Sequence, residues 1–158
     1  TGLKTATRFL AGYGRRYVSQ TVEKIMEYQG VDDLDPHERK RQHLLTESLW
    51  ENLTESGITS GMKGCVSGYF FAPNLEIAEG LLAPYVEDGE WKCRYTESKN
   101  EYIVEITSSL SYLSLEMLIE LADVFMVSAL EVDARFDGFE LKTSEILELN
   151  RKKRWKFW

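Results

Sequence analysis

The order of apolar segments between residues 62 and 139 constrains the fold more than any other feature of this chain. Runs rich in β-branched and aromatic residues alternate with stretches that repeat apolar side chains at three- and four-residue steps. Leu118, Leu121 and Phe125, for example, would share one face of a helix. In chain order the pattern predicts a strand at 64–71, a helix at 75–83, strands at 91–96 and 101–107, a helix at 115–128 and a strand at 130–136.

Residues between these segments support the same order. Pro84 should end or kink the first helix, and Asp88-Gly89 is typical of a turn. Ser114 is suited to cap the second helix. Strand, helix, strand, strand, helix, strand is the split βαβ pattern of a ferredoxin-like domain, with both helices on one face of an antiparallel sheet. The predicted class is therefore α+β, and because that fold hosts many functions it names none.

On this pattern the chain has three parts: an N-terminal helical extension at 1–58, the ferredoxin-like domain at 59–141, and a C-terminal helix with a basic aromatic tail at 142–158. Asp35-Pro36 predicts a helix start and Gly57 its end. The expected apolar side of this helix consists of Leu45, Leu49, Trp50 and Leu53. An earlier helix is predicted at 3–28. Residues 1–22 of the chain contain no acid, which fits either a targeting segment or an amphipathic helix docked on the domain.

Charge is distributed unevenly over the 158 residues, whose formal net charge is −7. Residues 44–150 carry 20 acids and 6 bases, whereas residues 151–158 carry 5 bases and no acid. A domain with this excess of carboxylates repels nucleic-acid phosphates and attracts basic protein surfaces. No apolar run approaches the roughly 20 residues that span a membrane. Cys65 and Cys93 fall on non-adjacent predicted strands, and we expect reduced core or half-buried thiols in a cytoplasmic protein.

The motifs of common enzymes are missing from this sequence. His37 and His43 are six residues apart, which is poor spacing for one helical face, and we expect both to be solvated. No further metal ligands accompany them, so we predict neither a metal nor a cofactor. There is no serine-nucleophile elbow, phosphate-cradling loop or dinucleotide fingerprint. The segment 64–71 resembles the first strand of acylphosphatases, but Ala72 stands where that family has its phosphate-binding arginine. We therefore expect a protein that is not an enzyme.

The candidate partner-binding residues are exposed acids and members of a closing Phe-Asp-Gly-Phe motif: Glu105, Glu116, Glu120, Asp123, Glu131, Asp133, Asp137 and Phe139. Glu131 and Asp133 would share the wet face of the last strand. Asp137-Gly138 fits a turn or bulge at the end of that strand, with aromatic residues clamping the end of the sheet. A free sheet edge or the first helix would also allow a dimer.

The tail has two interpretations. Its candidate anchor residues are Arg151, Lys152, Lys153, Arg154, Trp155 and Trp158. In the first interpretation the cations bind RNA phosphates or acidic lipid, and the aromatic rings stack or insert. In the second the tail is solvated or folds back on the acidic domain.

Two short motifs carry a resemblance to a known family. The first is Gly68-Tyr69-Phe70-Phe71, and the second is Leu121-Ala122-Asp123 followed by Arg135-Phe136-Asp137-Gly138-Phe139-Glu140. Over about residues 60–141 the chain resembles the regulator of ribonuclease activity B family, the protein inhibitors of ribonuclease E. The resemblance implies a ferredoxin-like domain that binds and inhibits a basic enzyme such as a ribonuclease. The alternatives are an immunity protein or antitoxin against a cognate toxin, and an adaptor tethered to RNA or acidic membrane through the tail.

Overall fold

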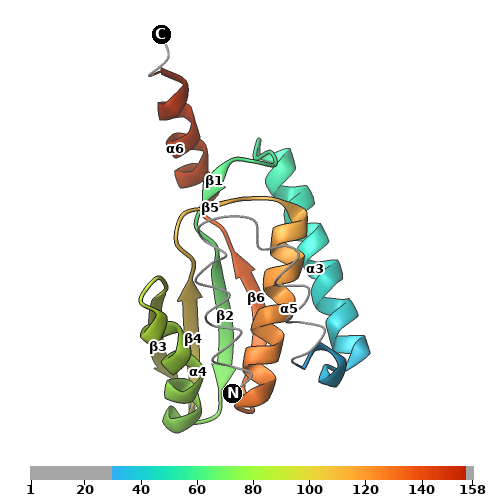
Figure 1. Ribbon diagram of the computed structural model, residues 1–158, viewed down its shortest axis with the longest axis vertical. Coiled ribbons are helices and arrows are strands. Elements are labelled where there is room, and N and C mark those ends of the chain that lie inside the picture. The colour runs from blue at the N-terminus through green and yellow to red at the C-terminus, as the bar shows by residue number, and fades with distance from the viewer. Residues whose placement is uncertain (1–29, 156–158) are drawn as a thin grey trace.

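The central sheet has four antiparallel strands in the part of the chain that the computed structural model describes, residues 30–155 (Figure 1). In spatial order they are β3 (Lys92–Ser98), β4 (Glu101–Thr107), β2 (Ser67–Ala72) and β6 (Arg135–Glu140). A separate small sheet pairs β1 (Lys63–Gly64) with β5 (Ser111–Tyr112). The helix predicted at 3–28 and the targeting segment considered for 1–22 lie outside the described residues.

Helices follow and separate these strands. A short 3-10 turn, η1 (Val31–Asp33), leads into α3 (Pro36–Glu55), and the later helices are α4 (Leu75–Asp88), α5 (Leu115–Glu131) and α6 (Thr143–Trp155). The side chains of Asp35, Asn74 and Ser114 cap α3, α4 and α5 by accepting a backbone N–H of the first turn. The caps predicted at Asp35 and Ser114 are therefore confirmed. Helices combined with antiparallel sheets confirm the α+β class.

α4 and α5 cover one face of the central sheet, and the core lies between the two layers (Figure 1). The fully buried ring of Phe125 on α5 occupies the middle of this core. Its centroid lies 5.2 to 6.0 Å from the rings of Phe70, Tyr85, Trp91, Phe136 and Phe139. Opposite this ring, β2 carries Gly68, where an added Cβ would lie only 2.4 Å from a carbon of Phe125. Glycine at this position therefore sets how closely α5 approaches the sheet.

A β-bulge in β6 gives the closing motif its structural role. Phe70 pairs with Phe136, while the residue before Phe70 pairs with Gly138, so Asp137 is an extra residue in the strand. Gly138 has a φ of 144°, which favours glycine. The bulge directs both Phe136 and Phe139 toward the helices, where their ring centroids lie 5.1 Å apart. The turn or bulge predicted at this motif is confirmed, but it lies inside the strand and not at its end.

Two predicted strands have different bounds in the structure. The strand predicted at 64–71 is divided, because Val66 leaves the ladder to exchange two hydrogen bonds with Ser108. The Val66 N–H donates to the Ser108 hydroxyl at 2.9 Å, and the Val66 carbonyl accepts the Ser108 N–H at 2.8 Å. The strand predicted at 130–136 is wrong over its first five residues. α5 continues to Glu131, and Asp133 with a φ of 60° makes the turn into β6.

Pro84 does not end α4, so of the two predicted outcomes, an end or a kink of the helix, the end is wrong. The helix continues to Asp88 and stops at Gly89, which has a left-handed φ of 75°. Tyr85, the residue after the proline, is fully buried and lies 2.7 Å from the Ser128 hydroxyl through its own hydroxyl oxygen. Burying this ring and its hydrogen bond outweighs the one backbone hydrogen bond that proline cannot make.

α3 packs on α5 and β6 through polar side chains as well as apolar ones. Leu53 is buried as predicted, but Leu45 is 48% exposed, so the predicted apolar side is partly wrong. Gln42 and Thr46 are buried instead. The Gln42 amide donates to the backbone carbonyl of Phe136 at 3.2 Å, which gives this buried polar group a partner.

Asp123 of α5 holds α3 by three short contacts. Arg39 donates from Nε and Nη2 to the two carboxylate oxygens at 3.0 and 2.9 Å, and His43 Nε2 lies 2.7 Å from Oδ1. Because Asp123 is only 6% exposed, water cannot readily replace these partners. The expectation that both histidines are solvated is therefore wrong for His43, whose side chain is 25% exposed.

Replacing Asp123 with asparagine should lower the free energy of unfolding by about 2 kcal/mol, because the Arg39 guanidinium loses its charged acceptor. Urea unfolding followed by circular dichroism measures this loss. Glu47→Gln, an exposed carboxylate on α3, is the control and should change stability by less than about 0.5 kcal/mol. An equal loss of unfolding free energy in the two variants would contradict a stabilising role of the contacts at Asp123.

The same Gly→Ala substitution should have opposite effects at two sites. Gly68→Ala should destabilise the fold by about 2 kcal/mol, because its methyl group would overlap the buried Phe125 ring. Gly80→Ala on α4 should stabilise it by up to about 1 kcal/mol, because its Cβ has room and alanine favours a helix. Thermal unfolding of the two variants checks the signs, and a Gly68→Ala variant as stable as the parent chain would rule out the proposed close approach.

Candidate functional site

The sheet face away from α4 and α5 carries polar side chains in transverse rows. The strand register places Arg94 beside Glu105 and Glu105 beside Tyr69. Arg94 forms an ion pair with Glu105, and the Tyr69 hydroxyl donates to Glu140 at 2.9 Å. These contacts tie β3 to β4 and β2 to β6, and they place a carboxylate on each side of one phenol.

This arrangement raises the pKa of Tyr69 to about 12. Burial is the main cause, because it disfavours the phenolate, and the hydrogen bond to Glu140 and the nearby charge of Glu105 act in the same direction. Tyr69 is therefore a neutral hydrogen-bond donor near physiological pH.

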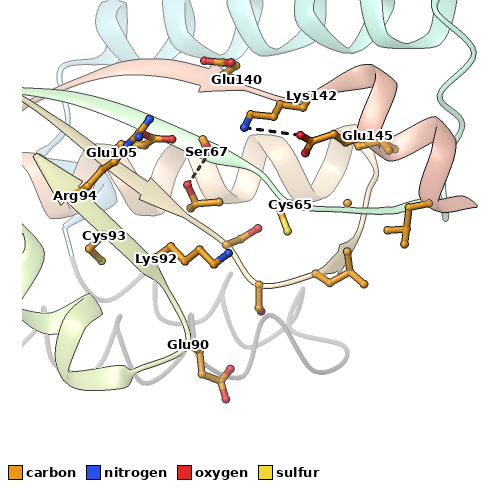
Figure 2. Close-up of a pocket in the computed structure, with 17 residues that line it drawn as sticks. Cys65, Ser67, Glu90, Lys92, Cys93, Arg94, Glu105, Glu140, Lys142 and Glu145 are labelled. Carbon is orange, nitrogen blue, oxygen red and sulfur yellow. Dashed lines mark hydrogen bonds and ion pairs between the residues drawn. The ribbon is translucent and has the colours of Figure 1, made fainter.

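A pocket of about 610 Å³ lies at one end of this face, between the sheet and α6 (Figure 2). Its volume is within the usual range for small-molecule sites. Ser67 and Thr107 contribute two hydroxyl oxygens 2.8 Å apart, and Leu110, Ile146 and Leu149 contribute apolar surface. The pocket thus combines hydrogen-bonding groups with an apolar side.

Both signs of charge line the pocket. Its charged residues are Glu90, Lys92, Arg94, Glu105, Glu140, Lys142 and Glu145. Lys142 Nζ lies 4.0 Å from a Glu145 oxygen, and Arg94 pairs with Glu105. Lys92 has no ion-pair partner among the described residues. A lining of this kind suits a ligand that itself carries both charges, and it disfavours a simple anion or cation.

Two free thiols border the pocket, and Figure 2 shows the sulfur of Cys65 directed into it. Partial burial of the sulfur raises the pKa of the Cys65 thiol, and the nearby Lys92 charge partly opposes this. Burial raises the pKa of Cys93 to about 11. Both thiols are therefore mostly protonated near neutral pH. Cys93 is half-buried as predicted, whereas Cys65 is exposed and does not belong to the core.

The structure disperses the acids that were predicted to bind a partner. Glu116 and Glu131 lie at opposite ends of α5, about 22 Å apart along its axis. Between them Asp123 is buried, so the exposed position expected for it is not found, and Glu120 is half-buried. Glu131 and Asp133 do not share a strand face, because one ends α5 and the other lies in the following turn.

The remaining predicted residues have separate environments. Glu105 lies on the sheet face and lines the pocket, but its side chain is only 13% exposed and is paired with Arg94. Asp137 is exposed at the bulge. Phe139 is half-buried and contacts the ring of Phe125, which indicates a packing role. Of the predicted set, Glu105 alone is among the residues that line the pocket.

The C-terminal helix predicted within 142–158 is confirmed as α6, and it continues into the basic tail. Asn150 fixes it to β1: its Oδ1 accepts the Lys63 N–H at 3.0 Å, and its Nδ2 donates to the Lys63 carbonyl at 2.9 Å. α6 points away from the central sheet, with exposed Arg151 near its outer end (Figure 1). The backbone of Lys152, Lys153, Arg154 and Trp155 is helical, but their side chains and the whole of Trp158 lie outside the described residues.

Glu140 and Lys92 are pocket residues that sequence reasoning missed. Alternation along 91–96 predicts that Lys92 lies on the face opposite the buried side chains. The pattern did not indicate that this face carries a pocket. Glu140 reaches this face only because the bulge at Asp137 shifts the alternation of β6 by one residue.

The described side chains include no group of histidine, cysteine or acidic residues that could hold a metal ion. None of the described helices is long and apolar enough to cross a membrane.

Iodoacetamide at pH 8 should modify Cys65 well before Cys93. Cys93, with a pKa of about 11, is roughly 0.1% thiolate at that pH. Below the thiol pKa each rate should rise about tenfold per pH unit, because the thiolate fraction does. Lys92→Met should slow modification of Cys65, because the ammonium lowers the pKa of that thiol. Peptide mass spectrometry measures both rates.

Lys40→Met is the matched control, since Lys40 is an exposed lysine on α3 and its loss should leave both rates unchanged. Equal modification rates at the two cysteines, or an unchanged Cys65 rate in the Lys92 variant, would contradict the described environment of the thiols.

Comparisons with known proteins assign no function to this pocket. No protein-family model matches the chain, and no curated protein matches it significantly. The resemblance to the regulator of ribonuclease activity B family therefore rests on the two motifs in the sequence. What the site does has to be inferred from its own residues.

Proposed function

We propose that the chain is a non-enzymatic, protein-binding regulator built on a ferredoxin-like domain, and that it binds a basic partner enzyme such as a ribonuclease. The succession β2, α4, β3, β4, α5, β6, interrupted by the short β5, supports the ferredoxin-like assignment. The strand order β3-β4-β2-β6 supports it as well.

The observation that carries this proposal is the charge of the helix layer. Together α4 and α5 contain eight carboxylates and no lysine or arginine, and one of the eight, Asp123, is paired with Arg39 and His43 of α3. Surface helices usually mix both signs, because pairs of opposite charge stabilise them. Side chains of one sign instead create a field that attracts an oppositely charged partner and accelerates its association.

Acids of α4 and acids at the end of α5 and in the following turn lie on neighbouring surfaces. Glu76 and Glu87 share a face of α4 with Gly80, since they lie four residues before and seven after it. An added Cβ at Gly80 would lie 3.9 Å from Val132, so this face borders the turn that follows α5. We call the four exposed acids of these surfaces the acidic band: Glu76, Glu87, Glu131 and Asp133.

The acidic band would inhibit a nucleic-acid enzyme without any chemical step. Such an enzyme presents lysines and arginines in the groove that binds its phosphate-bearing substrate. Carboxylates on the helix layer would occupy these cations and exclude the substrate. One exposed ion pair contributes little, so the affinity requires several contacts together and decreases as salt increases.

A pull-down with two matched triple variants tests the proposal. The band variant is Glu76→Gln, Glu87→Gln and Glu131→Gln, and the control variant is Glu47→Gln, Glu51→Gln and Glu55→Gln on α3, with the same change in net charge. Parent chain and control variant should retain one basic protein from a nuclease-treated lysate at low salt. The band variant should bind the purified partner at least about tenfold more weakly, because it loses three steering charges.

The partner's own activity, with and without the chain, then measures inhibition. Equal binding by the two triple variants would contradict the acidic band. A bait that ends at Asn150 tests the alternative in which the tail tethers the chain to RNA or acidic membrane. The direction of α6, away from the central sheet, favours this alternative (Figure 1), as does the exposure of Arg151. In a lysate without nuclease treatment, recovery of RNA or acidic lipid only with the complete tail would move the function to residues 151–158.

A further inference from the structure

One transverse row in the pocket joins a cation to a carboxylate through two hydroxyl groups. The strand register pairs Lys92 with Thr107, Thr107 with Ser67, and Ser67 with Glu140. Neighbouring strands lie about 4.8 Å apart, so the backbones of Lys92 and Glu140 are separated by about 14 Å. Figure 2 shows these two residues on opposite sides of Ser67.

Both ends of this row can accept a ligand. Lys92 is exposed and lacks an ion-pair partner within residues 30–151. Glu140 is exposed and accepts a hydrogen bond from the neutral Tyr69 hydroxyl, and within residues 30–151 it has no ion-pair partner. The other two cations of the pocket, Arg94 and Lys142, are each paired with a carboxylate. The row therefore offers one cation at one end and one anion at the other.

The row also has an apolar side. Leu110 lines the pocket yet is 44% exposed, and Leu149 is half-buried beside the buried Ile146. An apolar ligand group at this position would remove the exposed leucine surface from water, which is favourable in proportion to the area covered.

We propose that the pocket binds a short peptide of about three residues in its zwitterionic form. Lys92 binds the peptide carboxylate and Glu140 its ammonium group. The Ser67 and Thr107 hydroxyls bond to the peptide backbone, and a central apolar side chain rests on Leu110. This proposal does not depend on the basic partner, because the acidic band is a separate surface.

Length and charge select this ligand class. An extended tripeptide spans about 10 Å, and a hydrogen bond of about 3 Å at each end extends this to about 16 Å, close to the roughly 14 Å between the backbones of Lys92 and Glu140. A free amino acid is too short to reach both ends. A phosphate would meet four carboxylates in the lining, and a wholly cationic ligand would meet three bases.

Calorimetric titration with Gly-Leu-Gly and its two blocked forms tests the proposal. The free tripeptide should bind about tenfold more tightly than either the N-acetyl or the C-amide form, because each block removes one charge-assisted contact. In Lys92→Met the free and C-amide peptides should bind equally, while the N-acetyl form stays weaker. In Glu140→Gln the free and N-acetyl peptides should bind equally, while the C-amide form stays weaker.

Lys40→Met and Glu47→Gln are matched control variants outside the pocket and should bind the free tripeptide like the parent chain. The triple variant of the acidic band should also bind it normally, so failure of one proposal is distinguishable from failure of the other. No binding at millimolar peptide, or equal binding of free and blocked forms, would overturn the proposal. So would free leucine binding as tightly as the tripeptide.

Discussion

The contact between the Phe125 ring and the bare backbone at Gly68 positions the helix layer on the sheet. A ring carbon lies where a side chain at position 68 would begin, so α5 can approach β2 only because that side chain is absent. At this depth Phe125 also meets Phe70 on β2 and Tyr85 on α4. A single ring therefore fixes both helices against the strands, and dense packing leaves little freedom for either to shift.

The bulge at Asp137 links the packing of the core to the side chains on the other face of the sheet. Phe136 and Phe139 can both pack in the core only if one residue between them is left out of the alternation. The same shift places Glu140 on the face away from the helices, beside the Tyr69 hydroxyl. The charged row of the pocket is thus a consequence of how the core is packed.

Acids of the same helix acquire different roles from their surroundings. Asp123 faces α3, where Arg39 and His43 compensate its charge, and it contributes to the packing of the two helices. Glu131 ends the same helix at the surface, where partial burial raises its pKa. Charge counted along the chain cannot make this distinction, because burial is decided by the neighbouring helix.

The sequence by itself determined the features whose causes are local. Side chains at Asp35 and Ser114 bond to backbone N–H groups two or three residues ahead, and a run of β-branched and aromatic residues indicated the strand at 101–107. Only the tertiary structure decided that α4 continues through Pro84, that Asp123 is buried, and that Glu140 joins Lys92 in one pocket. Each of these depends on contacts between residues distant in sequence, whose energies exceed the local preferences that a sequence pattern records.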